Sequence, residues 1–311
     1  MNNNLLIDLW SYPVNVVMKT LLKDMTTGKN IIFATNSYMD IDSEIAEKTH
    51  ITEESLRVLG NEALQPRVKK TSAKQLERTR KKAEVFTPSW ICNKMNNHCD
   101  TEWFGREGVF NIENGQEWIV TETPVLFEKD KDWQKYIESK RLEITCGEAP
   151  YIVSRYDATT GVEIPVHNRI GILDRKLRVV NENTDNEKDW LKWTYKAFQS
   201  VYGYEFQGDN LLIARINLLI TFVDYMQERW NRFPIAKELE KIANIIVWNL
   251  WQMDGITGTI PFGNNGNMNR NTLMVLRSYE EKNFSQDKID CAIYDWKKRK
   301  EIKYRSIEEG A

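Results

Sequence analysis

YEFQGDNLLIARINLLITFVDYMQERWNRF, residues 204–233, joins a short apolar run to a long helical pattern. The first four residues predict a β-strand, and the apolar spacing from Asp209 onward predicts a helix that runs to about residue 233. Before it, residues 186–203 have the amphipathic spacing of another helix, for which Gly203 is the expected C-terminal cap. After it, ELEKIANIIVWNLWQMD, residues 238–254, predicts a helix that continues into a strand.

One more strand is predicted at the start of RLEITCGEAPYIVSRYD, residues 141–157, where a turn at Gly147 follows. Strands and helices therefore alternate from about residue 140 to 260, which is typical of parallel βα units in an α/β protein. Residues 161–185 contain only short apolar runs, so we expect a loop-rich segment there. In parallel sheets a ligand binds at the carboxyl ends of the strands, and this is where we expect a site.

The composition restricts the class of protein. The chain has 311 residues, of which 41% are hydrophobic and 28% charged, as in ordinary globular proteins. The net charge is only −2, so any contact with DNA must come from local patches. No apolar run is long enough to predict a membrane span, and no secretory signal is recognisable at the N-terminus. Four widely spaced cysteines favour neither a disulfide framework nor a zinc site, and a reducing cytoplasm fits them best.

The N-terminal part, residues 1–83, is expected to be a partly helical region of mixed structure. The sequence predicts a helix after Pro13, a short strand at residues 30–35 and helical pieces that end at Gly60. RVKKTSAKQLERTRKK, residues 67–82, then carries a local net charge of +7. This stretch is either a solvated helix or an arm that contacts DNA phosphates. Its cationic residues are Arg67, Lys69, Lys70, Lys74, Arg78, Arg80, Lys81 and Lys82.

Three acidic residues follow predicted strands and suit a nucleoside ligand. Glu143 ends the first strand, and the small residues after it, with Gly147, allow the backbone to approach a cofactor closely. Glu205 ends the second strand, where a carboxylate can accept hydrogen bonds from two ribose hydroxyls. Asp254 follows the third strand and can accept from an adenine amino group. Taken singly, each has a simpler explanation as a turn or surface residue.

The order of these motifs resembles a known family. EVFTPSWICNKM at residues 84–95 is followed by EITCGEAPY, by the YEFQGDNLLIARINLLI block and by IIVWNLWQMDG. This series is similar to the gamma-type N6-adenine DNA methyltransferases of restriction-modification systems, over roughly residues 60–260. The resemblance implies a Rossmann-like core, at residues 84–311, that binds S-adenosylmethionine.

The resemblance also implies roles for particular residues. Phe86, Thr87 and Pro88 would line the methionine side of the cofactor. The first cofactor loop would contain Glu143, Thr145, Cys146 and Gly147. Glu205 would bind the ribose and Asp254 the adenine amino group. The loop departs from the family pattern, and residues 152–200 would be an insertion; Glu163 lies nearer to the usual spacing but in the turn-like sequence TTGVEIP.

The family's NPPY-type tetrapeptide, which holds the flipped adenine, is absent, because no proline is followed by another or preceded by Asn or Asp. We therefore expect no catalytic residue and no metal ligand in this sequence. Three alternatives follow. In the first, the chain is one subunit of a split enzyme whose second polypeptide supplies the tetrapeptide and target recognition. In the second, it is an inactive relative that still binds cofactor. In the third, it is a regulator of such a system. A nuclease, with Glu163 and LDRK at residues 173–176 near a metal, and a non-enzymatic DNA-binding module are the rival classes.

Overall fold

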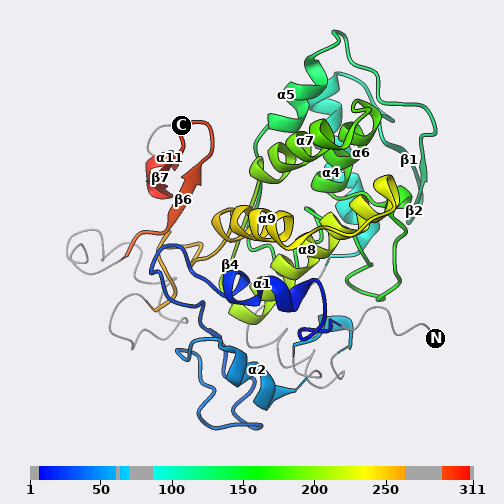
Figure 1. Ribbon diagram of the computed structural model, residues 1–311. Helices are drawn as coiled ribbons and strands as arrows, with labels where there is room; N and C mark the ends of the chain where they lie inside the picture. The colour runs from blue at the N-terminus through cyan, green and yellow to red at the C-terminus, as the bar shows by residue number, and fades with distance from the viewer. Residues whose placement is uncertain (1–6, 61–63, 70–86, 263–288, 309–311) are drawn as a thin grey trace, which may run out of the picture.

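A computed structural model describes residues 7–60, 64–69, 87–262 and 289–308 of the chain. Its centre is a three-stranded parallel sheet in the order β3-β4-β5 (Figure 1). These strands are β3 (Arg141–Glu143), β4 (Val201–Glu205) and β5 (Leu250–Gln252). Glu143 pairs with Gly203, and Glu205 pairs with Gln252. The chain is thus of mixed α/β class, and the parallel βα alternation expected for residues 140–260 is confirmed.

Two long helices connect β4 to β5. They are α8 (Gly208–Trp230) and α9 (Ala236–Asn249), as the apolar spacing predicts. Helix α8 is buried along most of its length, and even Arg215 within it is completely covered. The Arg215 guanidinium donates to the carbonyl of Leu250 at 2.7 Å and to that of Leu21 at 2.6 Å. Burial lowers its pKa to about 10. This arginine therefore ties the sheet to the N-terminal segment.

The connection from β3 to β4 is helical where a loop was expected. It contains η2 (Val166–Asn168), α6 (Ile172–Glu182) and α7 (Glu187–Gln199). The expectation of a loop-rich segment at residues 161–185 is wrong for α6. Its charged triplet Asp174, Arg175 and Lys176 is buried, and partners from other elements satisfy most of its polar atoms. A helix with buried charges has no plain polar face from which to recognise it.

Gly203 is not a helix cap. Helix α7 ends at Gln199 with Ser200 as its cap, and Gly203 lies inside β4. A Cβ at this position would come within 3.3 Å of the Cys146 side chain and of Ile152. The missing side chain therefore lets the loop after β3 pack against the sheet.

The N-terminal segment packs into the same hydrophobic core as the sheet. Helix α1 (Val14–Leu21) lies beside α8 and α9, and α2 (Glu53–Leu59) ends at Gly60 as predicted (Figure 1). The strand expected at residues 30–35 forms only isolated bridges, such as that between Ile32 and His50. The boundary expected near residue 84 lies outside the described residues.

Smaller elements surround this centre. On one side lie α4 (Ser89–Phe104), α5 (Asp132–Glu138) and the hairpin β1 (Asn111–Asn114) and β2 (Glu117–Val120), while η1 (Arg67–Lys69) lies elsewhere, toward α2 (Figure 1). On the other side of the sheet, the hairpin β6 (Ala292–Asp295) and β7 (Lys300–Lys303) precedes α11 (Arg305–Glu308), and its Ile293 packs near Tyr202 and Trp251. None of the helices in the described ranges has the length and apolar character needed to cross a membrane.

Candidate functional site

The carboxyl edge of the parallel sheet brings three predicted acidic residues to one side of the molecule. Glu143 and Glu205 are the last residues of β3 and β4, and Asp254 lies two residues beyond β5. The carboxyl ends of parallel strands share one edge, so these residues come together although they are far apart in sequence. Glu143 and Glu205 are 8% and 7% exposed. The expectation that Glu143 and Glu205 end neighbouring parallel strands is confirmed, and Asp254 follows the third strand at the same edge.

Glu205 connects the loop after β3 to the end of β4. Its Oε2 accepts the backbone N–H of Gly147 at 2.9 Å, and its Oε1 accepts that of Gln207 at 3.0 Å. Its carbonyl accepts the N–H of Met253 at 3.0 Å, which joins the end of β5 to the same point. Glu205 thus lies at the junction of all three strand ends.

Glu143 is a buried carboxyl group held by the same loop. It accepts the N–H groups of Tyr151 at 3.4 Å and Ile152 at 3.1 Å. Burial raises its pKa to about 8, and the Glu205 charge adds to this, whereas the two N–H donors oppose it. In the described part of the chain no lysine or arginine pairs with Glu143. A cationic group bound at this edge would therefore favour the charged carboxylate.

The loop after β3 has the tight conformation that the glycine motif predicts. Thr145, Gly147 and Ala149 have φ values of 47°, 54° and 65°, in the left-handed region. The Cys146 N–H donates to the carbonyl of Tyr204, and the buried Cys146 side chain contacts the position of Gly203. Burial raises the pKa of this thiol well above its ordinary value. Cys146 is a packing residue under the loop, and Thr145 is exposed above it.

Thr87 and Pro88, the described part of the FTP motif (residues 86–88), lie beside this loop. Thr87 and Pro88 precede α4, and the carbonyl of Thr87 accepts from Cys92 Sγ at 3.8 Å. From the same helix, Asn96 donates to the carbonyl of Tyr151 at 3.1 Å. The motif is thus brought beside the loop that carries Gly147. Phe86 lies outside the described residues.

Asp254 forms the turn that its sequence also predicts. Its Oδ1 accepts the N–H of Ile256 at 2.9 Å, and its own N–H donates to the carbonyl of Thr259. The side chain is only partly covered and lies at the carboxyl edge. The turn is therefore shown, and a contact with an adenine ring remains a prediction.

Sequence reasoning missed a buried cluster that supports the loop. The Tyr156 hydroxyl donates to Glu148 Oε2 at 2.6 Å. Asn217 of α8 donates to the Glu148 carbonyl at 3.1 Å and to the Tyr156 hydroxyl at 3.0 Å. The available signal was an asparagine between the apolar residues Ile216 and Leu218 of α8, since a buried polar side chain needs a defined partner.

We next consider the residues that would serve the two rival classes, a DNA-binding module and a nuclease. Of the predicted DNA contacts, only Arg67 and Lys69 are described, and Lys69 is exposed on η1. The nuclease candidate LDRK fails, because Asp174 Oδ2 accepts from Ser154 at 2.8 Å and Lys176 donates to the carbonyl of Ile137 at 2.9 Å. Across the described residues, no group of three or more His, Cys, Asp or Glu side chains could hold a metal.

Comparison with known proteins identifies no relative: no protein-family model matches the chain, and no curated protein or solved structure has significant similarity to it.

Substituting Glu143 should alter the pH dependence of stability. Because its pKa is raised from 4.5 to about 8, the folded state holds this proton more tightly than the unfolded state. The protonated Glu143 side chain therefore contributes its full stabilisation of the folded state below pH 4.5, and this contribution is lost as the pH rises through 8. Between pH 5 and 8 the free energy of unfolding of the wild type should fall by about 2–4 kcal/mol more than that of Glu143→Gln.

Urea unfolding at four pH values in this range measures the difference. Exposed Glu122→Gln serves as the control, and its curve should run parallel to the wild type. Identical pH dependence in wild type and Glu143→Gln would show that the Glu143 carboxyl is not the group that titrates.

Proposed function

We propose that this chain provides the S-adenosylmethionine-binding part of a DNA adenine N6-methyltransferase, with a Rossmann-like core built on β3, β4 and β5. The observation that carries the proposal is the arrangement of Glu143 and Glu205 around the Gly147 loop, at the carboxyl ends of adjacent parallel strands. Ligands of open α/β sheets bind at this edge. The resemblance of the motifs to the gamma-type enzymes supports the particular cofactor.

The chemistry of the site fits this cofactor. S-adenosylmethionine carries an ammonium and a sulfonium centre, and the buried Glu143 carboxyl has no cationic partner among the described residues. Binding of a cation would lower the pKa of Glu143 and stabilise its charged form. Glu205 would accept from the ribose hydroxyls, while the adenine amino group would donate to Asp254. When bound, the cofactor supplies an electrophilic methyl group, and the residues of this chain orient it.

Methyl transfer would require a polypeptide segment that carries the NPPY-type tetrapeptide. Among the described residues, β3 pairs with β4 alone, and its middle residue Leu142 is 44% exposed. An unpaired edge of a parallel sheet is a position where another strand can add. A strand added beside β3 would bring its carboxyl end next to Glu143. We propose that the second polypeptide and the target DNA join the site from this side, with residues 67–82 as a further DNA contact.

Photochemical labelling with methyl-labelled S-adenosylmethionine tests this proposal. The loop after β3 lies on one tryptic peptide, LEITCGEAPYIVSR, residues 142–155. We expect label on this peptide, and excess S-adenosylhomocysteine should suppress it. Labelling that avoids residues 142–155, or that the competitor leaves unchanged, would contradict the proposed site.

A further inference from the structure

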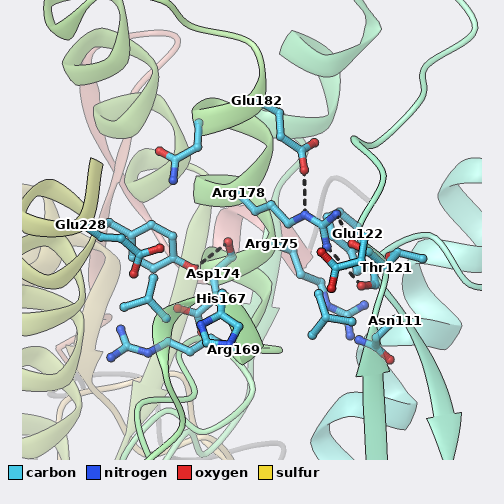
Figure 2. A pocket seen from close by; sticks show the side chains of 15 residues that line it. Asn111, Thr121, Glu122, His167, Arg169, Asp174, Arg175, Arg178, Glu182 and Glu228 are labelled. Atoms are coloured by element: carbon cyan, nitrogen blue, oxygen red, sulfur yellow. Dashed lines mark hydrogen bonds and ion pairs between the residues drawn. The ribbon is translucent and has the colours of Figure 1, made fainter. Parts of the chain in front are cut away.

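Two pockets in the described part of the chain are lined without the loop that carries Gly147. Figure 2 shows one of them, beside α6, whose arginines are neutralised by carboxylates, as Arg178 is by Glu182 at 2.7 Å. The second pocket, of about 200 Å³, differs because polar atoms that solvent can reach have no partner there. It is therefore the better candidate for a ligand site.

This second pocket, which we name the hairpin pocket, lies between the parallel sheet and the β6–β7 hairpin. Alternate residues of a strand share a face, and the register places Leu142 beside Tyr202. These two side chains and Trp251 form the wall on the sheet, and Ile302 and Tyr304 belong to the opposite wall. Leu142 is 44% exposed, and Ile302 and Tyr304 are half-buried, so a ligand can reach the walls from solvent. The volume is below the roughly 300–1,000 Å³ of pockets for drug-sized ligands, and it suits a single flat ring system.

The hairpin pocket has one hydroxyl group and one carboxylate oxygen without a partner among the described residues. Asp295 Oδ1 accepts the N–H groups of Lys297 at 3.0 Å and Lys298 at 2.9 Å, whereas its Oδ2 accepts none. Burial raises the pKa of Tyr202 to about 12 and the Asp295 charge adds to this, so the Tyr202 hydroxyl lies near that carboxylate. The Tyr202 hydroxyl has no partner either, and neither atom is among those that are completely covered. A ligand in the pocket can therefore bond to both.

Three exposed lysines surround this polar end of the pocket. Lys140 lines it just before β3, while Lys298 lies in the hairpin turn and Lys300 is opposite Asp295 on β7. The N–H of Lys298 lowers the pKa of Asp295 most, and the charges of Lys140 and Lys298 lower it further, so both ammonium groups lie near the carboxylate. None of the three lysines forms an ion pair in the described part of the chain, and Glu301 lies on the other face of β7. Three cations thus face one anion, and positive charge is left over.

We propose that the hairpin pocket binds an unpaired base of single-stranded nucleic acid, and that this base carries an exocyclic amino group. The ring would lie between the sheet and the hairpin, and its amino group would donate to Asp295 Oδ2. The flanking phosphates would contact Lys140 on one side and Lys298 and Lys300 on the other. Proteins that bind single strands combine such a cationic path for the backbone with aromatic side chains against which bases pack. This inference does not depend on the cofactor proposed for the carboxyl edge.

Fluorescence anisotropy with labelled oligonucleotides tests the class of base. The probes are oligodeoxycytidine of about 12 nucleotides and oligothymidine of the same length, which has a carbonyl in place of each amino group. Neither contains adenine, so the carboxyl edge is not probed. The wild-type chain should bind the cytidine strand about tenfold more tightly than the thymidine strand, because only cytosine donates to the Asp295 carboxylate. Free dCMP and a duplex of mixed sequence should each bind about tenfold more weakly than the cytidine strand.

Each comparison has an outcome that overturns part of the proposal. Equal affinity for the cytidine and thymidine strands would overturn the contact with the base. A duplex or free dCMP that binds as tightly as the cytidine strand would overturn the assignment to single strands. Absence of binding by all probes to the folded chain would overturn the site.

Variants locate the binding site. Asp295→Asn keeps an acceptor for the N–H groups of the turn and puts a donor in place of Oδ2, so the preference for cytidine should disappear. Lys140→Gln combined with Lys298→Gln should weaken both strands about tenfold and make binding less dependent on salt. Lys188→Gln, exposed on α7, is the matched control and should bind as the wild type does. An unchanged cytidine preference in Asp295→Asn that circular dichroism shows to be folded, or unchanged affinity in the double lysine variant, would contradict the proposal.

Discussion

Arg175→Met should lower the free energy of unfolding by about 3–5 kcal/mol, the range for breaking a buried ion pair from one side. Arg175 is 2% exposed. Its Nη1 pairs with Asp100 at 2.6 Å, and its Nη2 donates to Asn93 and Asn97, each at 2.8 Å. Without the guanidinium, the Asp100 carboxylate stays buried and keeps, among the described residues, only the hydrogen bond from the Tyr136 hydroxyl at 3.0 Å. The loss of stability is therefore mainly the cost of an uncompensated buried charge.

The contacts of Arg175 also hold in place the helix that follows Thr87 and Pro88, beside the carboxyl edge. Asp100, Asn93 and Asn97 belong to α4, whose first turn follows Thr87 and Pro88, and Arg175 belongs to α6. Urea unfolding measures the loss, and Lys188→Met, exposed on α7, should change stability by less than about 0.5 kcal/mol. Combining Arg175→Met with Asp100→Asn should restore part of the loss. A loss below about 1 kcal/mol for Arg175→Met alone would show that the Asp100 charge is not buried and unpaired as described.

Glu205→Ala should weaken S-adenosylmethionine binding about 100-fold or more, because two hydrogen bonds to a charged acceptor contribute roughly 1.5–3 kcal/mol each. The substitution also removes the acceptor for the N–H groups of Gly147 and Gln207, so the loop after β3 loses one of its attachments to β4. Both effects act in the same direction. Equilibrium dialysis with labelled cofactor measures the ratio, and circular dichroism confirms that the variant is folded.

Glu163→Ala is the matched control for this substitution. Glu163 lies at a spacing closer to that of the gamma-type enzymes whose motifs the sequence resembles, but it is exposed and forms an isolated bridge with Tyr156 rather than ending a strand of the sheet. Its removal should leave cofactor affinity unchanged. If Glu163→Ala weakened binding and Glu205→Ala did not, the acidic residue of the second strand would be wrongly assigned.

The elements that sequence reasoning predicts correctly are those whose apolar spacing is long and uninterrupted. Helices α8 and α9 have this property, the strands β4 and β5 are short apolar runs beside them, and the alternation of strand and helix is enough to predict a parallel sheet. Once the sheet is parallel, Glu143, Glu205 and Asp254 must share its carboxyl edge. This part of the candidate site follows from local pattern and topology alone.

The features that were not predicted depend on contacts between distant residues. Residues 30–35 have the composition of a strand, but the Ile32 N–H and carbonyl bond to the Gln252 side chain at 2.9 and 2.8 Å, and Ala34 has a φ of 51°. Helix α6 is hidden in the sequence because its charged residues find partners on α4, α5 and the loop before it. The Tyr156–Asn217 pair joins residues 61 positions apart. No local pattern carries such information.

Calorimetric titration of S-adenosylmethionine into the wild-type chain measures whether the strand ends hold this cofactor. We expect saturable heat with a stoichiometry of one and a dissociation constant on the order of micromolar, and competition by S-adenosylhomocysteine. Heat no greater than dilution for both ligands, from a chain that circular dichroism shows to be folded, would contradict the account.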